Sequence, residues 1–148
     1  MDAMALAFRL DLLKLIFWGT AIANLADNAA SAPLTNLQLA LHTDDPGSGG
    51  DQTTHEIVYT GYARAAVARS SAGWTIAGNI DDAFATLATD IAFPTATGMA
   101  GHLATYASLG FAAIGAGRIV CRGALQGPLT IVVGNAPKLV RGTAFTLG

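Results

Sequence analysis

Three histidines, one glutamate and one cysteine are the side chains of this chain whose chemistry is most often catalytic or metal-binding. His55 and Glu56 are adjacent, as at the start of a zinc-protease motif, but that motif needs a second histidine where Tyr59 stands. A cupin-type metal site needs two histidines one residue apart, and His42, His55 and His102 are isolated in the sequence. We therefore expect structural or surface roles for the histidines, and we predict no catalytic residue and no metal ligand.

Two further features could carry chemistry: a single cysteine as a nucleophile and a glycine motif as a nucleotide-binding loop. Cys121 lies between Val120 and Arg122 in an alternating segment. This favours a buried, inert thiol over a nucleophile, although a cationic neighbour would lower the pKa of the thiol. The Gly-Ala-Gly sequence at residues 115–117 lacks the third glycine and the strand-to-helix setting of a dinucleotide-binding fingerprint, and the chain has no Walker lysine. The sequence therefore predicts no cofactor.

Acidic pairs and aromatic residues offer two weaker alternatives. The pairs Asp44-Asp45 and Asp81-Asp82 could bind calcium, but neither has the alternating ligand spacing of a calcium loop, and solvated turns are favoured. Trp74, Tyr59 and Tyr62 could form a platform that stacks on sugars or bases. Their period-two spacing among strand residues favours core and cross-strand packing instead, and we expect Trp74 to be largely buried.

A helix is expected to precede the residues considered so far. Apolar residues recur at spacings of three and four over residues 4–25, with Gly19 as a point where the helix could end or kink. Its apolar stripe is too large to leave in water, so it packs either on the chain's own strands or on a neighbouring molecule. The candidate partner-binding residues are those of the stripe, Leu10, Leu13, Phe17 and Trp18.

After Pro33 the periodicity changes to two, which is typical of half-buried strands. Residues 44–52 form a loop, and residues 81–89 fit either a helical turn or a loop. The predicted strands cover residues 37–42, 56–69 with a bulge or bend at Gly61, 73–79, 88–94, 102–108, 118–124, 129–133 and 138–147. The pattern predicts a mostly β, antiparallel sandwich or barrel of about eight strands. One domain is expected, with the helix and a connector in residues 1–33 and the sandwich in 34–148.

The composition excludes several classes of protein. Charged residues make up 12% of the 148, against about 25% in ordinary soluble domains, and the net charge is −2. The chain is 52% hydrophobic, which argues against disorder, and its eight cations are scattered singly, unlike those of a nucleic-acid-binding protein. One cysteine cannot make a disulfide scaffold. Low charge promotes association, so the composition fits either a subunit of an assembly or a sparingly charged monomer.

The N-terminal region contains an apolar segment that resembles neither a membrane span nor an export signal. Its longest uncharged stretch, Leu15–Ala23, is far shorter than the roughly 18 to 20 residues that cross a bilayer. Asp2, Arg9, Asp11 and Lys14 interrupt the pattern that a secretory signal requires. We expect a chain that is made and kept in a cytoplasm, where a lone cysteine stays reduced.

The middle of the chain resembles a family of small tailed-bacteriophage virion proteins through a series of short motifs. These are LHT at residues 41–43, DPG at 45–47, YTGYAR at 59–64, VAR at 67–69, GWT at 73–75, GN at 78–79 and FP at 93–94. With GALQGPLTI at 123–131 and the N-terminal helix, the resemblance covers about residues 10–147. The motif residues with expected structural roles are His42, Asp45, Pro46, Gly47, Tyr59, Gly61, Tyr62, Arg64, Trp74, Phe93 and Pro94.

Members of this family are often described as tail-fibre proteins, and a related class is the capsid cement or decoration protein. The resemblance implies a jelly-roll fold and a non-enzymatic structural role on the outer surface of the capsid. There the protein would bind and stabilise the shell of major capsid protein, as a homodimer, with no nucleic-acid or membrane partner. The alternative is a tail or tail-fibre component that acts as a binding module, and an enzyme such as a barrel hydrolase comes third.

Overall fold

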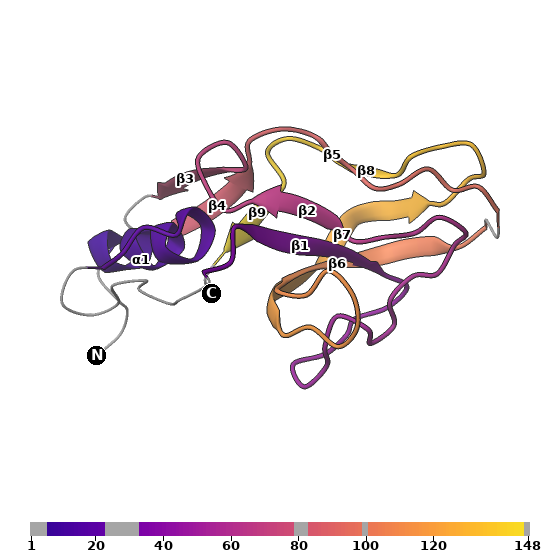
Figure 1. The fold of residues 1–148 in the computed structure, drawn as a ribbon, viewed down its shortest axis with the longest axis horizontal. Coiled ribbons are helices and arrows are strands. Elements are labelled where there is room, and N and C mark those ends of the chain that lie inside the picture. The colour runs from indigo at the N-terminus through magenta and orange to yellow at the C-terminus, as the bar shows by residue number, and fades with distance from the viewer. Residues whose placement is uncertain (1–5, 23–32, 79–82, 99–100, 147–148) are drawn as a thin grey trace. The chain divides into compact units, whose positions relative to one another are not determined.

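The computed structural model describes residues 6–22, 33–78, 83–98 and 101–146 (Figure 1). Within these residues the chain forms a short helical segment followed by nine strands. The helical segment consists of α1 (Leu6–Leu13) and a π-helical turn, η1 (Lys14–Trp18). The strands are β1 (Asn36–His42), β2 (Ala65–Ala68), β3 (Trp74–Gly78), β4 (Ala83–Leu87), β5 (Ile91–Ala92), β6 (Leu103–Gly110), β7 (Ile119–Thr130), β8 (Lys138–Leu139) and β9 (Ala144–Thr146).

The strands belong to three sheets, in the orders β2-β1-β6-β7, β3-β4-β9 and β5-β8. The pairings β1–β6, β6–β7, β3–β4, β4–β9 and β5–β8 are all antiparallel. This confirms the predicted fold class, mostly β with antiparallel sheets and one N-terminal helical segment. The described residues divide into two compact units, one within 1–36, 68–90 and 140–148 and the other within 37–67 and 91–139.

In the first unit the helical segment packs on strands of its own chain (Figure 1). Leu13 and Phe17 are almost completely buried, and the Phe17 ring lies 4.6 Å from the Trp74 ring in an edge-to-face contact. The Trp74 ring also contacts Phe145 edge-to-face at 5.3 Å. Trp74 itself has 0% of its surface exposed, as predicted. The aromatic cluster therefore belongs to the core of this unit.

The remaining two stripe residues are only half-buried. Leu10 and Trp18 keep part of their surface accessible, and the Trp18 Nε1–H donates to the Trp74 carbonyl at 3.2 Å. For Leu13 and Phe17, the choice between packing on the chain's own strands and packing on a neighbour is thus resolved in favour of the former. A partner contact through the stripe remains a prediction for the exposed parts of Leu10 and Trp18.

The helical segment ends at Gly19, which is one of the two outcomes, an end or a kink, expected there from the sequence. Gly19 takes φ +68°, a left-handed conformation that favours glycine at a helix C-terminus, and the N–H of Thr20 closes back on the Lys14 carbonyl at 3.1 Å. Residues 20–22 are not helical, so the predicted extension beyond Gly19 is wrong there, while residues 4–5 and 23–25 lie outside the described part. No helix in the described residues is long and apolar enough to span a membrane.

Arg69 fixes the end of this helical segment to the rest of the first unit. Its Nε–H donates to the Ile16 carbonyl at 2.5 Å, and Nη2 donates to the Leu15 carbonyl. Nη1 reaches the Leu34 carbonyl at 3.2 Å. A guanidinium at a helix C-terminus satisfies carbonyls that have no partner in the helix, and its charge complements the helix dipole. Arg69 therefore donates to the last carbonyls of the helical segment the hydrogen bonds that another helical turn would otherwise provide.

The second unit is built on the four-stranded sheet. In the β1–β6 pairing Leu39 lies opposite Leu109, and Leu41 lies opposite Ala107. The three leucines have 0% exposure, so they form the centre of this unit's core. Burial continues on both faces of β1 from Leu39 to His42, which shows that each face of the sheet is covered there.

Four predicted strands have different boundaries because of backbone turns or a bulge. Of residues 56–69 only β2 is a strand, because Gly61 has φ +96° and the N–H of Tyr62 turns back to the Tyr59 carbonyl at 2.9 Å. Residues 138–147 split into β8 and β9 at a turn where Gly142 has φ +86°. The two strands predicted at 118–124 and 129–133 are the single strand β7, in which residues 125–128 bulge opposite Thr105.

Residues 81–89 are expected from the sequence to form a helical turn or a loop, and for residues 83–87 both expectations are wrong. Residues 83–87 form β4, the central strand of the sheet β3-β4-β9. Its burial alternates along the strand, with Ala83, Ala85 and Leu87 buried. The period-two pattern was present in the sequence, but two of its three inward positions are alanine and give little contrast in hydropathy.

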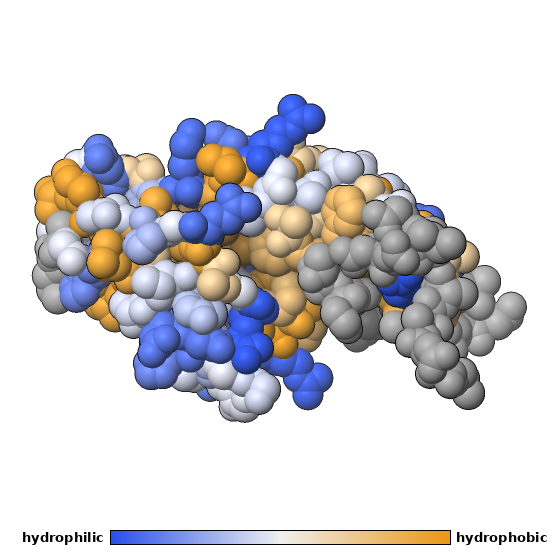
Figure 2. Space-filling model, turned by 180° about the vertical axis from the view of Figure 1, so that it is seen from behind, coloured by the Kyte–Doolittle hydropathy of each residue, from blue (hydrophilic) through white to orange (hydrophobic). Residues whose placement is uncertain are grey.

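Surface hydrophobic residues are dispersed. Figure 2 shows, on the face it presents, several separate hydrophobic patches between hydrophilic residues. The large hydrophobic side chains that are exposed in the described residues are Leu34, Val58, Leu103, Phe111, Ile114, Val132, Val133 and Val140. Ile114 is the extreme case, with 87% of its surface exposed. Scattered apolar side chains are normal on a soluble protein, so contacts built on them would be individually modest.

Replacing Arg69 by glutamine should lower the free energy of unfolding by about 1.5 to 3 kcal/mol, because hydrogen bonds from a charged group to the helix carbonyls are lost. Urea denaturation followed by the fluorescence of Trp18 and Trp74 measures this. Arg141 is exposed in the same unit, and Arg141→Gln should stay within about 0.5 kcal/mol of the unsubstituted protein. Equal stabilities for the two variants would contradict the capping role.

Candidate functional site

The glycine-rich loop, residues 43–56, is a surface segment of the second unit that is held by many hydrogen bonds. It leaves β1 and returns to the same strand, because the N–H of Thr43 donates to the His55 carbonyl at 2.9 Å and the N–H of Ile57 donates to the Leu41 carbonyl at 2.9 Å. Thr105 Oγ1 on β6 donates to the Thr43 carbonyl at 2.7 Å. The loop is therefore held at its base by two neighbouring strands.

Gln52 anchors the middle of the glycine-rich loop. Its side chain is fully buried, donates from Nε2 to the Gln38 carbonyl at 3.0 Å and accepts at Oε1 from the N–H of Ala112 at 3.2 Å. Its own N–H donates to the Gly117 carbonyl at 2.9 Å. A Cβ atom on Gly110 or Gly117 would lie 2.3 or 2.2 Å from the Gln52 side chain, so a side chain at either position would displace Gln52. Gln52 thus joins the loop to β1 and to the 111–118 turn.

His42 makes the second anchor. It is fully buried, with Nδ1 2.8 Å from the Thr54 carbonyl and Nε2 2.7 Å from Ser108 Oγ. A carbonyl only accepts, so Nδ1 carries the proton and Nε2 accepts from the serine hydroxyl. Burial lowers the pKa of His42, while the Thr54 hydrogen bond and the charge of Glu56 oppose that shift and the charge of Arg64 adds to it. The imidazole is therefore held neutral and in one tautomer.

Glu56 and Arg64 make the third anchor, a bidentate ion pair. Arg64 Nε lies 2.7 Å from Glu56 Oε1, and Nη2 lies 2.7 Å from Oε2. Nη1 donates to the Ala112 carbonyl at 2.9 Å, and the Arg64 side chain is only 3% exposed. Tyr62 adds a hydroxyl that donates to Glu56 Oε1 at 3.0 Å and accepts from the N–H of Leu41. The Glu56 carboxylate raises the pKa of Arg64, and burial raises the pKa of Tyr62.

Asp45 connects the tip of the loop to β7. Its carboxylate accepts from the N–H of Gly47 at 2.9 Å and from Arg122 Nε at 2.6 Å, and these two partners hold its pKa below the usual range. Gly47 takes φ +72°, which an L side chain rarely adopts, and Pro46 before it is buried. Asp44 accepts from the N–H of Asp45, so both carboxylates serve the turn. This favours the solvated-turn interpretation of the acidic pair.

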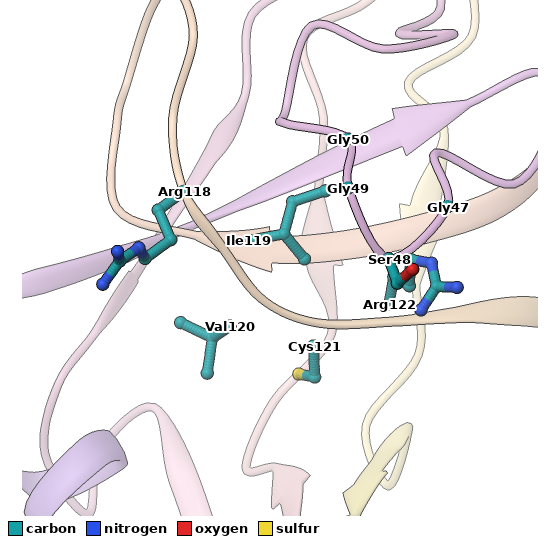
Figure 3. A pocket seen from close by; sticks show the side chains of 9 residues that line it. All are labelled: Gly47, Ser48, Gly49, Gly50, Arg118, Ile119, Val120, Cys121 and Arg122. Atoms are coloured by element: carbon teal, nitrogen blue, oxygen red, sulfur yellow. The ribbon is translucent and has the colours of Figure 1, made fainter.

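An open cavity of about 430 Å³ separates the loop tip from β7 (Figure 3). It is lined by the backbone of Gly47–Gly50 on one side and by Arg118–Arg122 on the other. Four of the lining residues, Ile119–Arg122, belong to β7, which is an edge strand of the four-stranded sheet, so the cavity lies beside that strand. We call this cavity the edge groove. The wall formed by the loop tip carries only the side chain of Ser48, because its other three residues are glycine.

The aromatic motif residues lie in cores. Tyr59 is buried, packs edge-to-face on Tyr62 at 5.2 Å, and donates its hydroxyl to the Pro94 carbonyl at 2.8 Å. Tyr62 stacks on the buried ring of Phe93 at 6.4 Å. Trp74 lies in the core of the first unit. The core-packing interpretation is thus confirmed for Tyr59 and Trp74, and an exposed stacking platform built on these two residues is excluded.

The other candidate residues do not form a reactive site. Cys121 is half-buried rather than fully buried as predicted, and the partial burial of its sulfur raises the pKa of the thiol to about 12, so the thiol stays protonated near neutral pH. His55 and His102 are exposed. In residues 6–22, 33–78, 83–98 and 101–146, no group of three or more histidine, cysteine, aspartate or glutamate side chains could hold a metal. Asp81 and Asp82 lie outside the described residues.

Sequence reasoning missed the residues that anchor the loop from outside the recognised motifs. Gln52 lies in a polar, glycine-containing segment, where no sequence pattern indicates burial. Ser108 and Gly110 occupy buried positions at the end of an apolar strand. A polar residue and a glycine at such positions were the only sequence signal that buried polar groups are accommodated there. Gly117 was tested only as part of a dinucleotide fingerprint, whereas its role is to leave room for Gln52.

Acidification should destabilise the fold through His42. The unfolded chain binds a proton near pH 6.5 and the folded chain binds it only at lower pH, so the free energy of unfolding is highest above about 6.5 and decreases as pH falls below it. His42→Asn, whose amide can still donate to Thr54, should show a shallower decrease in urea titrations. His102→Asn should keep the full decrease. If the free energy of unfolding of His42→Asn decreased with falling pH as steeply as that of the unsubstituted protein, His42 would not be the group responsible.

Gly117→Ala should lower the free energy of unfolding by about 1 to 3 kcal/mol, because the new Cβ collides with Gln52 Oε1. Gly49→Ala is the matched control: an added Cβ there meets nothing within 4 Å, and the change should stay within about 0.5 kcal/mol. Truncating Gln52 to alanine should reduce the cost of Gly117→Ala, which a double-mutant cycle measures. Additive effects would show that Gln52 is not the obstacle.

The chain matches a family of known proteins over most of its length. The family model described as Gp80, Podophage GP4 fiber I protein gp80, matches residues 17–145. No curated protein matches the chain. The match agrees with the resemblance to tailed-phage virion proteins, and its description is that of a fibre protein rather than a capsid cement. The chain therefore belongs to the podophage GP4 fiber I protein gp80 family of bacteriophage virion structural proteins.

Proposed function

We propose that this chain is a non-enzymatic structural subunit of a phage fibre, which binds other virion proteins through the clamped glycine-rich loop and the edge of β7. The observation that carries the proposal is the open edge groove beside a loop held by three buried polar anchors. The description of the matching family as a fibre protein supports the location. From the sequence alone, the capsid surface is the first expectation and a tail fibre is the alternative.

Rigidity of the loop favours a binding role. Ordering a mobile loop on binding costs free energy, and a loop that is already fixed avoids most of that cost. Here Gln52, His42 and Glu56 tie the loop to β1, to β6 and to the 111–118 turn. The exposed tip at Ser48 and Gly49 is presented without large side chains, so that another backbone can approach closely.

Binding through many modest contacts fits the rest of the surface. The exposed apolar residues of the second unit come from several segments and include Val58 and Ile114 at 64% and 87% exposure. With 12% charged residues, few ions need to be desolvated when such a surface is covered. The partners we propose are other virion proteins and a second copy of this chain. Nucleic acid and membranes are not among them, since the cations are scattered singly.

A second candidate function is a capsid cement on the outer surface of the head, where the partner is the major capsid protein. The composition favours it, because a low-charge surface rich in small residues can lie close to a repetitive protein shell. Such a subunit would stabilise the assembled shell by mass action. The two candidates place the protein at different positions on the same particle and in different copy numbers.

Location and copy number test the proposal directly. Antibody labelling of purified virions should place gold particles at the fibres, and a stained gel should show far fewer copies than of the coat protein. An isotype-matched antibody against the major capsid protein provides the control for head labelling. Labelling over the whole head, with a copy number approaching that of the coat protein, would overturn the fibre location in favour of the cement. Absence of the chain from purified virions would contradict both.

A further inference from the structure

The edge groove carries positive charge on a chain that is slightly acidic overall. Among its nine lining residues, Arg118 and Arg122 are the charged ones, and none is acidic. The sequence from residue 91 to residue 139, which supplies the strand side of the groove, contains no aspartate or glutamate. The net charge of the whole chain is −2. The groove therefore differs in sign from the rest of the protein and favours an anionic ligand.

The two arginines differ in how their charge is compensated. Arg122 Nε lies 2.6 Å from Asp45 Oδ1 and Nη2 lies 3.4 Å from Oδ2, so one carboxylate neutralises this guanidinium. Arg118 is exposed, and its guanidinium makes no hydrogen bond or ion pair with the described residues. A guanidinium presents five N–H donors in one plane, which match the two oxygens of a carboxylate. Arg118 thus leaves the groove with an uncompensated positive charge.

The loop tip adds hydrogen-bond donors on the opposite side. The N–H groups of Gly47 and Gly50 are occupied, by the Asp45 carboxylate at 2.9 Å and by the Gly47 carbonyl at 3.4 Å. Those of Ser48 and Gly49, and the Ser48 hydroxyl, have no hydrogen-bond partner within the described part of the chain, and both residues are exposed. Successive backbone N–H groups in a tight turn attract anions. Both sides of the groove therefore offer donors to the same kind of ligand.

Size and spacing indicate which anion fits. The cavity has about 430 Å³, whereas a water molecule takes up about 30 Å³, so a single small ion would fill little of it. Arg118 and Arg122 are four residues apart, which is at most about 13 Å of extended chain. Figure 3 shows their side chains at opposite ends of the lining strand segment. A peptide with more than one carboxylate can reach both ends. No lining residue is aromatic, so the groove lacks the stacking surface of a single-stranded nucleic-acid site.

We infer that the edge groove binds a short acidic segment of another virion protein, whose carboxylates meet Arg118 at one end and the loop tip at the other. The inference rests on the proposed function and adds the chemistry of its partner. The Asp45–Arg122 ion pair ties the loop to β7, so the groove exists before the ligand arrives. Exposed ion pairs are individually weak and are screened by salt, so binding should weaken as ionic strength rises.

A titration of the isotope-labelled chain with end-capped hexaglutamate at low salt, followed by the NMR signals of the backbone amides, tests the inference. The amide signals of Ser48 and Gly49 should shift with added peptide. Arg118→Glu should raise the Kd about fivefold or more, because an attractive pair becomes repulsive. Arg141→Glu changes the net charge equally at an exposed residue outside the groove, and its Kd should stay within about twofold of the unsubstituted protein.

A second pair of variants tests the loop side of the groove. A Cβ on Gly49 meets nothing within 4 Å, so both Gly49→Asp and Gly49→Asn are compatible with the folded loop. The two side chains have nearly the same shape and differ in charge. The Kd of Gly49→Asp for hexaglutamate should therefore exceed that of Gly49→Asn by about fivefold, because a carboxylate at the tip repels those of the peptide. Equal values would show that the tip does not face the ligand.

Other outcomes would also overturn the inference. If hexaglutamate leaves the loop-tip amides unshifted, or if Arg118→Glu binds it as tightly as the unsubstituted chain, the groove is not an acidic-peptide site. Tighter binding of an oligothymidylate of equal charge would assign the groove to nucleic acid, and equally tight binding of inorganic phosphate would reduce it to a general anion contact. The titration uses purified protein, so its failure would leave the fibre location untouched, and a wrong location would leave the chemistry of the groove untouched.

Discussion

The bidentate ion pair between Glu56 and Arg64 is the interaction on which the loops of the second unit depend. Arg64 is almost fully buried, and a buried cation is tolerated only when a charge and hydrogen bonds compensate its lost hydration. Glu56 supplies the charge, and the Ala112 carbonyl supplies the remaining acceptor. Because Glu56 ends the glycine-rich loop and Ala112 lies in the 111–118 turn, the cation can be satisfied only when both loops are in place. Glu56 is also the only glutamate of the chain.

The other anchors obey the same constraint, that a buried polar group must find all its partners. Gln52 uses both ends of its amide, and His42 uses both ring nitrogens. Each of these side chains contacts two segments that are far apart in the sequence. A partial arrangement would leave buried donors or acceptors unpaired, so the loop has one conformation rather than several. Binding surfaces on such loops are ready before a partner arrives.

Hydropathy patterns correctly predicted the strands in which large apolar residues alternate with polar ones. β1, β3 and β6 and the burial of Trp74 followed from leucine and aromatic residues at period two. Alanine gave too little contrast to reveal β4, and the Gly127-Pro128 pair suggested a turn where the structure has a bulge. An edge strand tolerates proline there, because its N–H need not join the ladder. The polar anchors could be predicted only where a motif resemblance included them, as for His42 and Arg64, since burial of Gln52 has no periodic signature.

The bulge in β7 has a consequence for aggregation. Together with the register shift beside Gly110, it restricts the regularly paired part of this edge strand to Cys121–Ala124, and the opposite edge of the sheet is the four-residue strand β2. A long, regular strand edge is a template on which further chains can add as new strands, whereas a short or bulged edge offers too few aligned hydrogen bonds for such growth. The irregularity of one strand therefore protects the sheet against open-ended polymerisation.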